Sequence, residues 1–355
     1  MSTYGIAISG GSEHPVAVPG SDGVIPRLVA LGGGHGLSAT LRAARLVADR
    51  VTAVVTVADD GGSSGRLRRE FDILPPGDLR MALCALAGES EEHQRLTELF
   101  QHRYGGTGAL AGHAVGNLVF TGLWELTGDP IEALDAVGSI LGVAGRVLPM
   151  SPVALDIAAE VVGLEADPRV VRTIIGQVAV ATTPGSVRRV RLIPEDPPAA
   201  AGVVEAVDSA DVVVLGPGSW FTSVIPNVLV PEIAAALART PATKVLVLNL
   251  APQPGETAGF SAEQHLHVLR QHAPQIDVDV ILVDPRMPLS GTEQEHLDRA
   301  AAGLGARVVT AEIAETAADG TMKALHDPEL LASALVTSTS GIRGSSTNEG
   351  AQECR

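Results

Sequence analysis

The chain has 355 residues, of which 45% are hydrophobic and only 3% aromatic, and it carries a formal net charge of −16. That length can bury a sizeable core, and a composition rich in Ala, Val, Leu and Gly suits helices packed on a parallel sheet better than an all-β sandwich. The acidic charge argues against non-specific binding to nucleic acid or to anionic lipid. An anionic ligand would have to be bound locally, by helix N-termini and a few basic side chains.

Cysteine content and hydropathy indicate the cellular compartment in which the protein is expected. The two cysteines, Cys84 and Cys354, cannot build a disulfide framework or a four-ligand zinc site. The segment from Met1 to Gly20 has neither a basic start nor a long apolar run, so we expect no signal peptide. No apolar run approaches the ~18–20 residues that span a bilayer. We therefore expect a cytoplasmic protein that binds no nucleic acid and does not insert into a membrane.

The first half of the chain predicts a βαβ unit followed by helices. Apolar strands over 27–31 and 51–57 flank a helix over 37–49 whose apolar spacing is helical. Residues 75–150 are predicted to be a helical insertion over the strand ends. The helices expected there are 78–87, 91–100, 114–126 and 130–141, and they are followed by a mixed region, 153–191, with short β-like pieces at 157–162 and 177–181.

Strands return in the second half and alternate with helical patterns. This alternation predicts a doubly wound, mostly parallel, Rossmann-like α/β sheet. We expect one domain over residues 26–337, with a flexible segment at 1–25 and a disordered tail at 338–355, because both ends are polar and lack periodicity. The expected strands are 211–215, 244–249, 278–283 and 307–309, with helices at 233–237 and 262–272.

A glycine loop follows the first strand and opens the first helix. Glycines at this place let a phosphate approach the unpaired N–H groups of the helix N-terminus. The dinucleotide fingerprint is incomplete because its third glycine falls on Leu37, and no Gly-Lys-Ser/Thr follows. A tight turn without a ligand is the alternative interpretation, and acid–base catalysis by the loop histidine stays open. The candidate ligand-binding residues are Gly33, Gly34, His35 and Gly36.

A second polar loop follows the strand at 51–57, where an open α/β sheet binds its ligands. Asp59 stands about where a dinucleotide fold places the acid that accepts ribose hydroxyls. Because successive side chains alternate along an extended chain, only one of Asp59 and Asp60 can face the ligand, and the other would cap the loop or meet a metal ion. A guanidinium could clamp a phosphate through two parallel hydrogen bonds. The candidates in this loop are Asp59, Asp60, Gly62, Ser63, Ser64 and Arg66.

Five further motifs add polar groups, and three of them have a structural alternative. Asp78 could simply cap a helix, with Arg80 in its first turn, and the pair His113 and Asn117, at i and i+4, could belong to the core. The segment 326–328 could pack back over the site or start the last helix. Glycine, hydroxyl and amide groups also follow two later strands, at Gly218, Ser219, Asn249 and Gln253, and their convergence with the earlier loops is stronger evidence for a site than any one motif.

Taken in order, these motifs resemble the YvcK/CofD-like family over nearly the whole chain, from about Pro26 to Leu335. The resemblance implies one of two branches. One contains the 2-phospho-L-lactate transferases of deazaflavin cofactor F420 synthesis, and the other contains gluconeogenesis factors that bind UDP-sugars and are linked to cell shape and wall metabolism on gluconeogenic carbon. The motifs are 32–38, 59–68, 76–80, 112–117, 216–219 and 249–257.

The chain is more similar to the gluconeogenesis-factor branch, through 249–257 and the pair His326-Asp327. It departs from the family at His35, where Thr is frequent, and at Leu325, where a basic residue is common. This branch implies a regulatory protein that binds a UDP-sugar such as UDP-N-acetylglucosamine and has no established reaction. A regulatory protein partner and a homo-oligomer stay open.

The transferase branch is the alternative, and it implies a magnesium-dependent enzyme that transfers a phosphorus-containing group. Its Mg2+ would be held by Asp59 or Asp60, and the sequence fixes no other cofactor.

Overall fold

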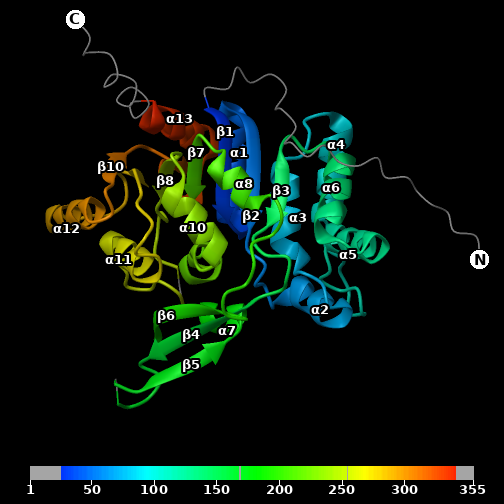
Figure 1. The fold of residues 1–355 in the computed structure, drawn as a ribbon, viewed down its shortest axis with the longest axis horizontal. Coiled ribbons are helices and arrows are strands. Elements are labelled where there is room, and N and C mark those ends of the chain that lie inside the picture. Colours follow the sequence, from blue (N-terminus) through cyan, green and yellow to red (C-terminus); the bar gives the residue numbers. More distant parts are fainter. Residues whose placement is uncertain (1–24, 168, 254, 341–355) are drawn as a thin grey trace, which may run out of the picture.

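The computed structural model describes residues 25–167, 169–253 and 255–340, and its centre is a seven-stranded parallel sheet (Figure 1). Every neighbouring pair in this sheet is parallel. The strand order is β10-β9-β8-β7-β1-β2-β3. The strands are β1 Ile25–Gly32, β2 Ala48–Val55, β3 Arg146–Pro149, β7 Val212–Leu215, β8 Thr243–Val247, β9 Val280–Val283 and β10 Arg307–Thr310.

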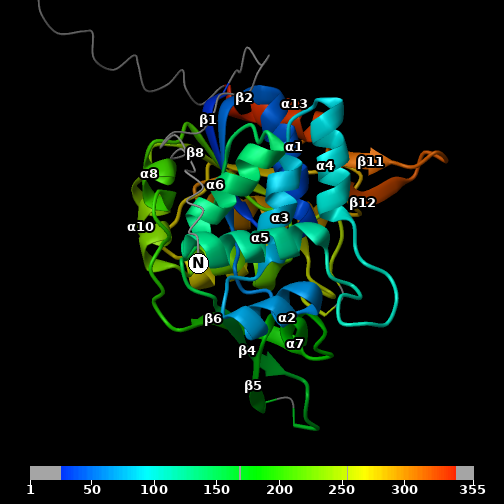
Figure 2. The ribbon, with the colours of Figure 1, turned by 90° about the vertical axis from the view of Figure 1, so that its right-hand side faces the viewer.

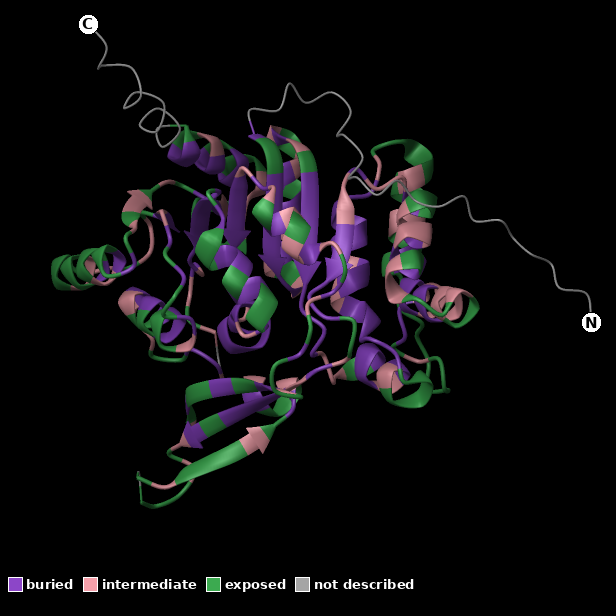
Figure 3. Cartoon of the chain, in the orientation of Figure 1, coloured by how far each residue is buried: buried purple, intermediate pink, exposed green. Residues whose placement is uncertain are grey.

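The central strands are buried on both faces, which explains why they are continuous apolar runs in the sequence. All of Val212–Leu215 and Val280–Val283 is buried, and Figure 3 shows the middle of the sheet as almost entirely buried. The predicted doubly wound, mostly parallel α/β sheet is confirmed. The described residues predicted to lie in the tail, beginning at Ser338, instead continue the last helix, where Ser338 and Thr339 are buried and bond back to the Leu335 carbonyl. The expected flexible segment 1–25 and the rest of the tail lie outside the described residues, except for Ile25.

Helices cover both faces of the sheet. Helices α3 and α13 pack against α1 on one face, while α8 packs with α10 on the other (Figure 1). The helices are α1 Gly34–Val47, α2 Gly62–Phe71, α3 Pro76–Ala85, α4 Glu91–Gln101, α5 Val115–Thr127, α6 Pro130–Leu141, α7 Gln177–Ala181, α8 Val203–Asp208, α9 Ile225–Val228, α10 Pro231–Arg239, α11 Ala262–His272, α12 Gly291–Ala302 and α13 Pro328–Thr339, with a π-helical turn, η1, at Trp220–Val224.

The helical insertion lies mainly beside the sheet. Helix α3 packs against β2 and β3, and α6 packs against β3, while α2, which precedes the insertion, lies near the ends of the strands (Figures 1 and 2). The insertion also ends in a strand that the sequence analysis does not predict: the four-residue β3 adds to the sheet edge beside β2.

Two smaller sheets depart from the parallel pattern. The antiparallel sheet β5-β4-β6 lies below the main sheet in Figure 1, and the hairpin β11–β12 projects to the right in Figure 2. The β-like piece expected at 177–181 is wrong, because the chain turns at Gly176, with φ +105°, and forms helix α7. These strands are β4 Asp156–Val162, β5 Val171–Ile175, β6 Ser186–Ile193, β11 Ala314–Thr316 and β12 Met322–His326.

Across the described residues, no helix alone combines the length and the apolar composition that a membrane crossing requires. Only Trp220–Val228 and Pro231–Arg239 taken together meet that test, and they are bent by 72° relative to each other.

The strand order reverses between β1 and β7, and this reversal places the loops that follow them side by side. In open α/β sheets such a switch point forms the ligand-binding crevice. The contact is close: a Cβ added to Gly36 would lie 2.1 Å from the Pro217 carbonyl oxygen. Only glycine therefore fits between the two loops.

We expect Gly36→Ala to lower the free energy of unfolding by about 1–3 kcal/mol or more, because backbone atoms on both sides must move apart. Gly122→Ala is the matched control, since Gly122 lies inside α5 with open space around its Cα. That control should stabilise the protein by up to about 1 kcal/mol. Urea unfolding of both variants measures the difference, and equal midpoints would contradict the close contact.

Candidate functional site

A cavity of 890 Å³ opens at the carboxyl ends of the strands, at the switch point between β1 and β7. Its volume is in the range of small-molecule sites, about 300–1,000 Å³. The wall combines the first turns of α1, the loops after β7 and β8, the middle of α3, the end of α4 and the hairpin β11–β12. The lining includes His35, Gly36, Ser38, Ala39, Arg42, Arg80, Gln101, Arg103, Pro217, Gly218, Asn249, Gln253, Glu315, Leu325 and His326.

The N-terminus of α1 forms one end of this cavity. Helix α1 starts at Gly34, and its N-cap residue, Gly33, supplies no side-chain cap. The Gly34 N–H is bonded to Asp78, so the other N–H groups of the first turn and the partial positive charge of the terminus are available to an anion. Gly34 has φ +57°, a left-handed conformation that favours glycine. The predicted phosphate-binding loop therefore has the geometry that such a role needs.

Three arginines add positive charge to the wall in a chain whose net charge is −16. Arg42 lies on α1 and makes no hydrogen bond or ion pair within the described part of the chain, and Arg103 follows α4 and donates to the Gly112 carbonyl (3.0 Å). Arg80 is almost completely buried, with 3% of its surface exposed. The only carboxylate among the described lining residues, Glu315, is paired with Lys323 (3.1 Å). The cavity is therefore a local basic site on an acidic protein.

A buried polar network holds Arg80 in place. Arg80 Nε donates to Asn117 Oδ1 (2.9 Å), and Asn117 Nδ2 donates to Ser63 Oγ (3.0 Å). Ser63 Oγ in turn lies 2.9 Å from His113 Nδ1. Arg80 Nη1 also donates to Gln101. Burial and the nearby Arg66 lower the pKa of His113, so the ring is neutral. Its Nδ1 can therefore accept a hydrogen bond from the Ser63 hydroxyl.

Asp59 and Asp60 take different directions after β2, as the alternation of an extended chain requires. Asp60 turns toward the small antiparallel sheet, where Oδ1 accepts the Val178 N–H (3.0 Å) at the start of α7. The second carboxylate beside Asp59 is Asp78, which lies against the glycine loop: a Cβ added to Gly33 would be 2.6 Å from Asp78 Oδ2. A metal ion beside the glycine loop would therefore be bound by Asp59 and Asp78, because Asp60 is hydrogen-bonded to Val178 instead.

Burial, and after it the nearby Asp59 carboxylate, raise the pKa of Asp78 to about 7. A hydrogen bond from the Gly34 N–H and the positive Arg80 act in the opposite direction. The described residues contain no group of three or more His, Cys, Asp or Glu side chains that could hold a metal ion. Mg2+ is often bound by one or two carboxylates together with phosphate oxygens, so Asp59 and Asp78 fit Mg2+ only alongside a phosphorylated ligand.

The amide predicted to bind a base or a sugar, Asn249, instead holds the loop after β7. Its Oδ1 accepts the Gly218 N–H (2.9 Å) and its Nδ2 donates to the Gly218 carbonyl (2.8 Å). Gln253 lies beside it, with Nε2 3.5 Å from Ser219 Oγ. Asn249 therefore shapes the cavity wall rather than presenting a free amide.

Two further predicted residues stabilise neighbouring loops. Arg66 Nη2 donates to the Ala111 carbonyl (2.7 Å), and Ser64 Oγ accepts the Gly77 N–H (3.0 Å). Gly62 is the first residue of α2 and has φ +46°. These residues, together with Ser63, His113 and Asn117, form a polar cluster next to the cavity and do not line it.

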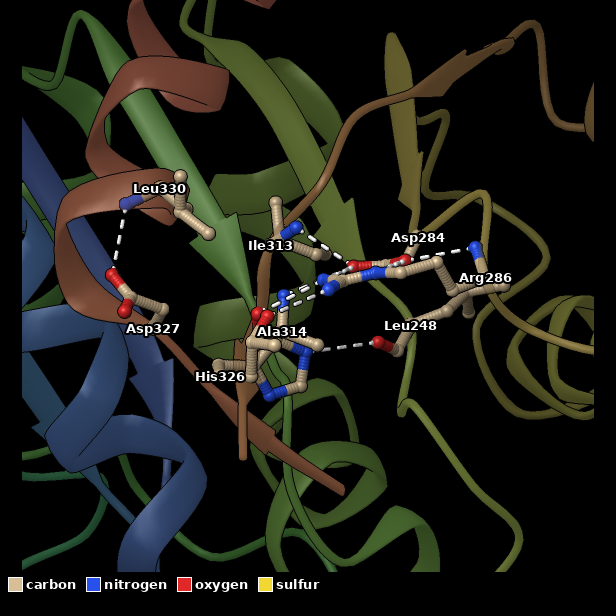
Figure 4. Close-up of polar contacts among 9 residues, drawn as sticks. Leu248, Asp284, Arg286, Ile313, Ala314, His326, Asp327 and Leu330 are labelled. Carbon is tan, nitrogen blue, oxygen red and sulfur yellow. Dashed lines mark hydrogen bonds and ion pairs between the residues drawn. The ribbon is translucent and has the colours of Figure 1, made fainter. Parts of the chain in front are cut away.

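The sequence analysis did not predict several of the residues that line the cavity. Gln101, Arg103 and Glu315 stand in no motif, and nothing in the sequence places them near the glycine loop. Arg42 carries a faint signal, because it follows Ser38 by one helical turn and so shares its face of α1. The segment at 326–328 fulfils both interpretations: His326 lines the cavity, and Asp327 caps α13 by accepting the Glu329 and Leu330 N–H groups (Figure 4).

Comparison with known proteins agrees with this architecture. The sequence profile of the family described as 2-phospho-L-lactate transferase CofD matches residues 28–323. The chain belongs to the YvcK/CofD-like family. It is 62% identical over 308 residues to a Mycobacterium tuberculosis protein provisionally named a gluconeogenesis factor, covering 87% of this chain and 89% of that protein.

More distant relatives extend the match. The chain is 39% identical over 259 residues to the gluconeogenesis factor of Bacillus subtilis, covering 73% of this chain and 78% of that protein. A crystal structure of a UPF0052 family member from Bacillus halodurans is also similar, with 35% identity and a TM-score of 0.76, over 88% of this chain and 98% of that one. Both the sequence and the fold are thus shared across the family.

Asp78 generates a prediction about pH and stability. Because its pKa is about 7 in the folded protein and ordinary in the unfolded chain, the folded state binds this proton more tightly. The free energy of unfolding should therefore fall, relative to Asp78→Asn, as the pH rises from about 4 to about 7, and stay constant above that. At pH 8 the variant should be more stable by roughly 2–4 kcal/mol.

Urea unfolding of the wild type and of Asp78→Asn between pH 5 and 8.5, at fixed ionic strength, measures this difference. The exposed Asp277→Asn serves as the control for a general charge effect. Parallel stability curves for the wild type and Asp78→Asn would show that Asp78 does not titrate in this range.

Proposed function

We propose that this protein is a gluconeogenesis factor that binds a UDP-sugar, such as UDP-N-acetylglucosamine, in the 890 Å³ cavity, and acts through that binding. The observation that carries the proposal is the basic cavity at the switch point, where the N-terminus of α1 meets Arg42, Arg80 and Arg103. An acidic chain with a local basic cavity of this size is suited to a small ligand that carries phosphates. The names of the relatives support the physiological assignment.

The walls suggest how such a ligand would lie. The diphosphate would accept hydrogen bonds from the α1 N-terminus and from the arginines, as phosphates do at helix N-termini. The uncharged parts would then extend along the loop after β8 and the hairpin β11–β12, which supply Leu250, Ala251, Pro252 and Leu325. Apolar walls with a few placed polar groups are typical of small-molecule sites.

The physiological role follows from the family branch. We propose that the bound state is sensed by a regulatory protein partner in the cytoplasm, and that it affects cell shape and wall metabolism on gluconeogenic carbon. Homo-oligomer formation is compatible with this role.

Two separate observations favour a second candidate function. The family profile is described as a transferase, and the neighbouring carboxylates Asp59 and Asp78 could share Mg2+ with a diphosphate. A magnesium-dependent 2-phospho-L-lactate transferase-like enzyme is therefore the alternative. In that enzyme the metal would neutralise phosphate charge, while the α1 N-terminus and Arg80 would orient the phosphate.

A ligand panel separates the two functions. Thermal shift and calorimetry with UDP-N-acetylglucosamine, UDP-glucose, UDP, NAD and GDP, each with and without Mg2+, would measure binding. A ligand at 100 times its dissociation constant stabilises the folded state by about 2.7 kcal/mol. Stabilisation by UDP-sugars without Mg2+ supports the regulator, and a shift that requires Mg2+ and prefers GDP supports the transferase.

Arginine variants test the cavity itself. We expect Arg42→Gln and Arg103→Gln each to weaken binding of UDP-N-acetylglucosamine about 5- to 30-fold, through loss of a charged contact to phosphate. Arg50→Gln is the matched control, because Arg50 is also exposed but lies on β2 outside the cavity. Calorimetry gives the dissociation constants, and an equal effect of all three substitutions would place the ligand elsewhere.

A further inference from the structure

His326 is fixed in the cavity wall by the ends of two central strands. It closes β12, where it pairs with Ala314 of β11. Asp284, directly after β9, accepts the N–H groups of Ile313 and Ala314 (2.8 and 2.9 Å), and its other contacts are to Arg286. Figure 4 shows these groups converging on one side of the imidazole. The base of the hairpin is thus attached to the rigid sheet rather than free to move.

A second strand end determines the tautomer of the ring. The Leu248 carbonyl, just after β8, lies 3.3 Å from His326 Nε2 (Figure 4). Burial lowers the pKa of His326 to about 4, although the Leu248 carbonyl and Asp284 act in the opposite direction. The ring is therefore neutral, and a carbonyl can only accept, so the proton lies on Nε2 and Nδ1 carries a lone pair.

Nδ1 is the atom left for a ligand. It makes no hydrogen bond to any residue that the structure describes, and His326 is a lining residue of the cavity. We propose that His326 Nδ1 accepts a hydrogen bond from an uncharged N–H or O–H group of the bound nucleotide-sugar. This inference rests on the proposed function, and it assigns His326 as a specificity-determining residue of that site.

The charge of the ligand limits which part His326 can contact. A lone pair on Nδ1 repels phosphate oxygens, which are acceptors themselves. The contact must therefore be to the sugar or to the base, and the diphosphate must lie toward the α1 N-terminus and the arginines. Leu325, the preceding residue, is 52% exposed and also lines the cavity, so it can cover an apolar part of the same group. Together the two residues make the hairpin base the part of the wall that distinguishes one nucleotide-sugar from another.

Two isosteres separate contact with the ligand from support of the wall. The amide of His326→Gln can reach the place of Nε2 and donate to the Leu248 carbonyl, but it leaves no acceptor at Nδ1. The amide of His326→Asn places an oxygen near Nδ1 and gives up the Leu248 contact. We expect His326→Gln to bind UDP-N-acetylglucosamine about five- to tenfold more weakly, and His326→Asn to bind within about twofold of the wild type.

Calorimetry on the full chain measures these affinities, and thermal midpoints without ligand confirm that each variant folds. The ring 15N spectrum of the wild type gives a second readout: it should show the Nε2-protonated tautomer, and the Nδ1 signal should shift when UDP-N-acetylglucosamine binds. Wild-type affinity in His326→Gln, equal losses in both variants, or an unchanged Nδ1 signal would overturn the inference while leaving UDP-sugar binding intact. Absence of any UDP-sugar binding by the wild type would instead overturn the proposed function and this inference together.

Discussion

The site depends on the contact between two backbone loops at the switch point of the sheet. The first turn of α1, which follows β1, and the loop after β7 touch where Gly36 meets Pro217, with no room for a Cβ between them. This contact aims the N-terminus of α1 at the same opening that the later strands surround. A side chain at Gly36 would separate the loops and also tilt the helix that supplies the anion-binding end of the cavity.

Positive charge is concentrated around this contact, although the chain as a whole carries a net negative charge. The helix terminus and three arginines share one cavity, while Asp59 and Asp78 are kept behind the glycine loop. The raised pKa of Asp78 is the consequence, because a buried carboxyl next to another carboxylate is easier to keep protonated. A proton or a divalent cation could neutralise this pair, and that choice is the physical difference between a binding protein and a magnesium-dependent transferase.

The rest of the wall is preorganised by hydrogen bonds that have no direct role toward a ligand. Asn249 holds both backbone groups of Gly218, and Asn117 with Ser63 fixes Arg80. On the opposite side, Asp284 and the Leu248 carbonyl fix the hairpin that carries His326 (Figure 4). A cavity with walls fixed in this way loses little conformational entropy when a ligand binds.

The sequence by itself determined the parallel sheet, the glycine loop at the first helix and the polar loops at the strand ends. It could do so because buried parallel strands are continuous apolar runs and because glycine and helix-start signals are local. The opposite directions of Asp59 and Asp60 also followed, since alternation along an extended chain is a local property. Strands in which charged residues interrupt the apolar ones were missed, such as β6 (Ser186–Ile193) and β12 (Met322–His326), and α7 at 177–181 resembled a strand because Val-rich segments fit both.

Only the tertiary structure decided which polar residues share the cavity. Arg42, Arg103 and His326 come from elements far apart in the sequence, and their meeting depends on strand order and on how α4 and the hairpin β11–β12 pack. The same holds for Asn249, whose amide is used up by the Gly218 backbone, and for Asp60, which is used by α7. A side chain's chemistry can be predicted from its type, but its partner is set by long-range packing, which no local pattern encodes.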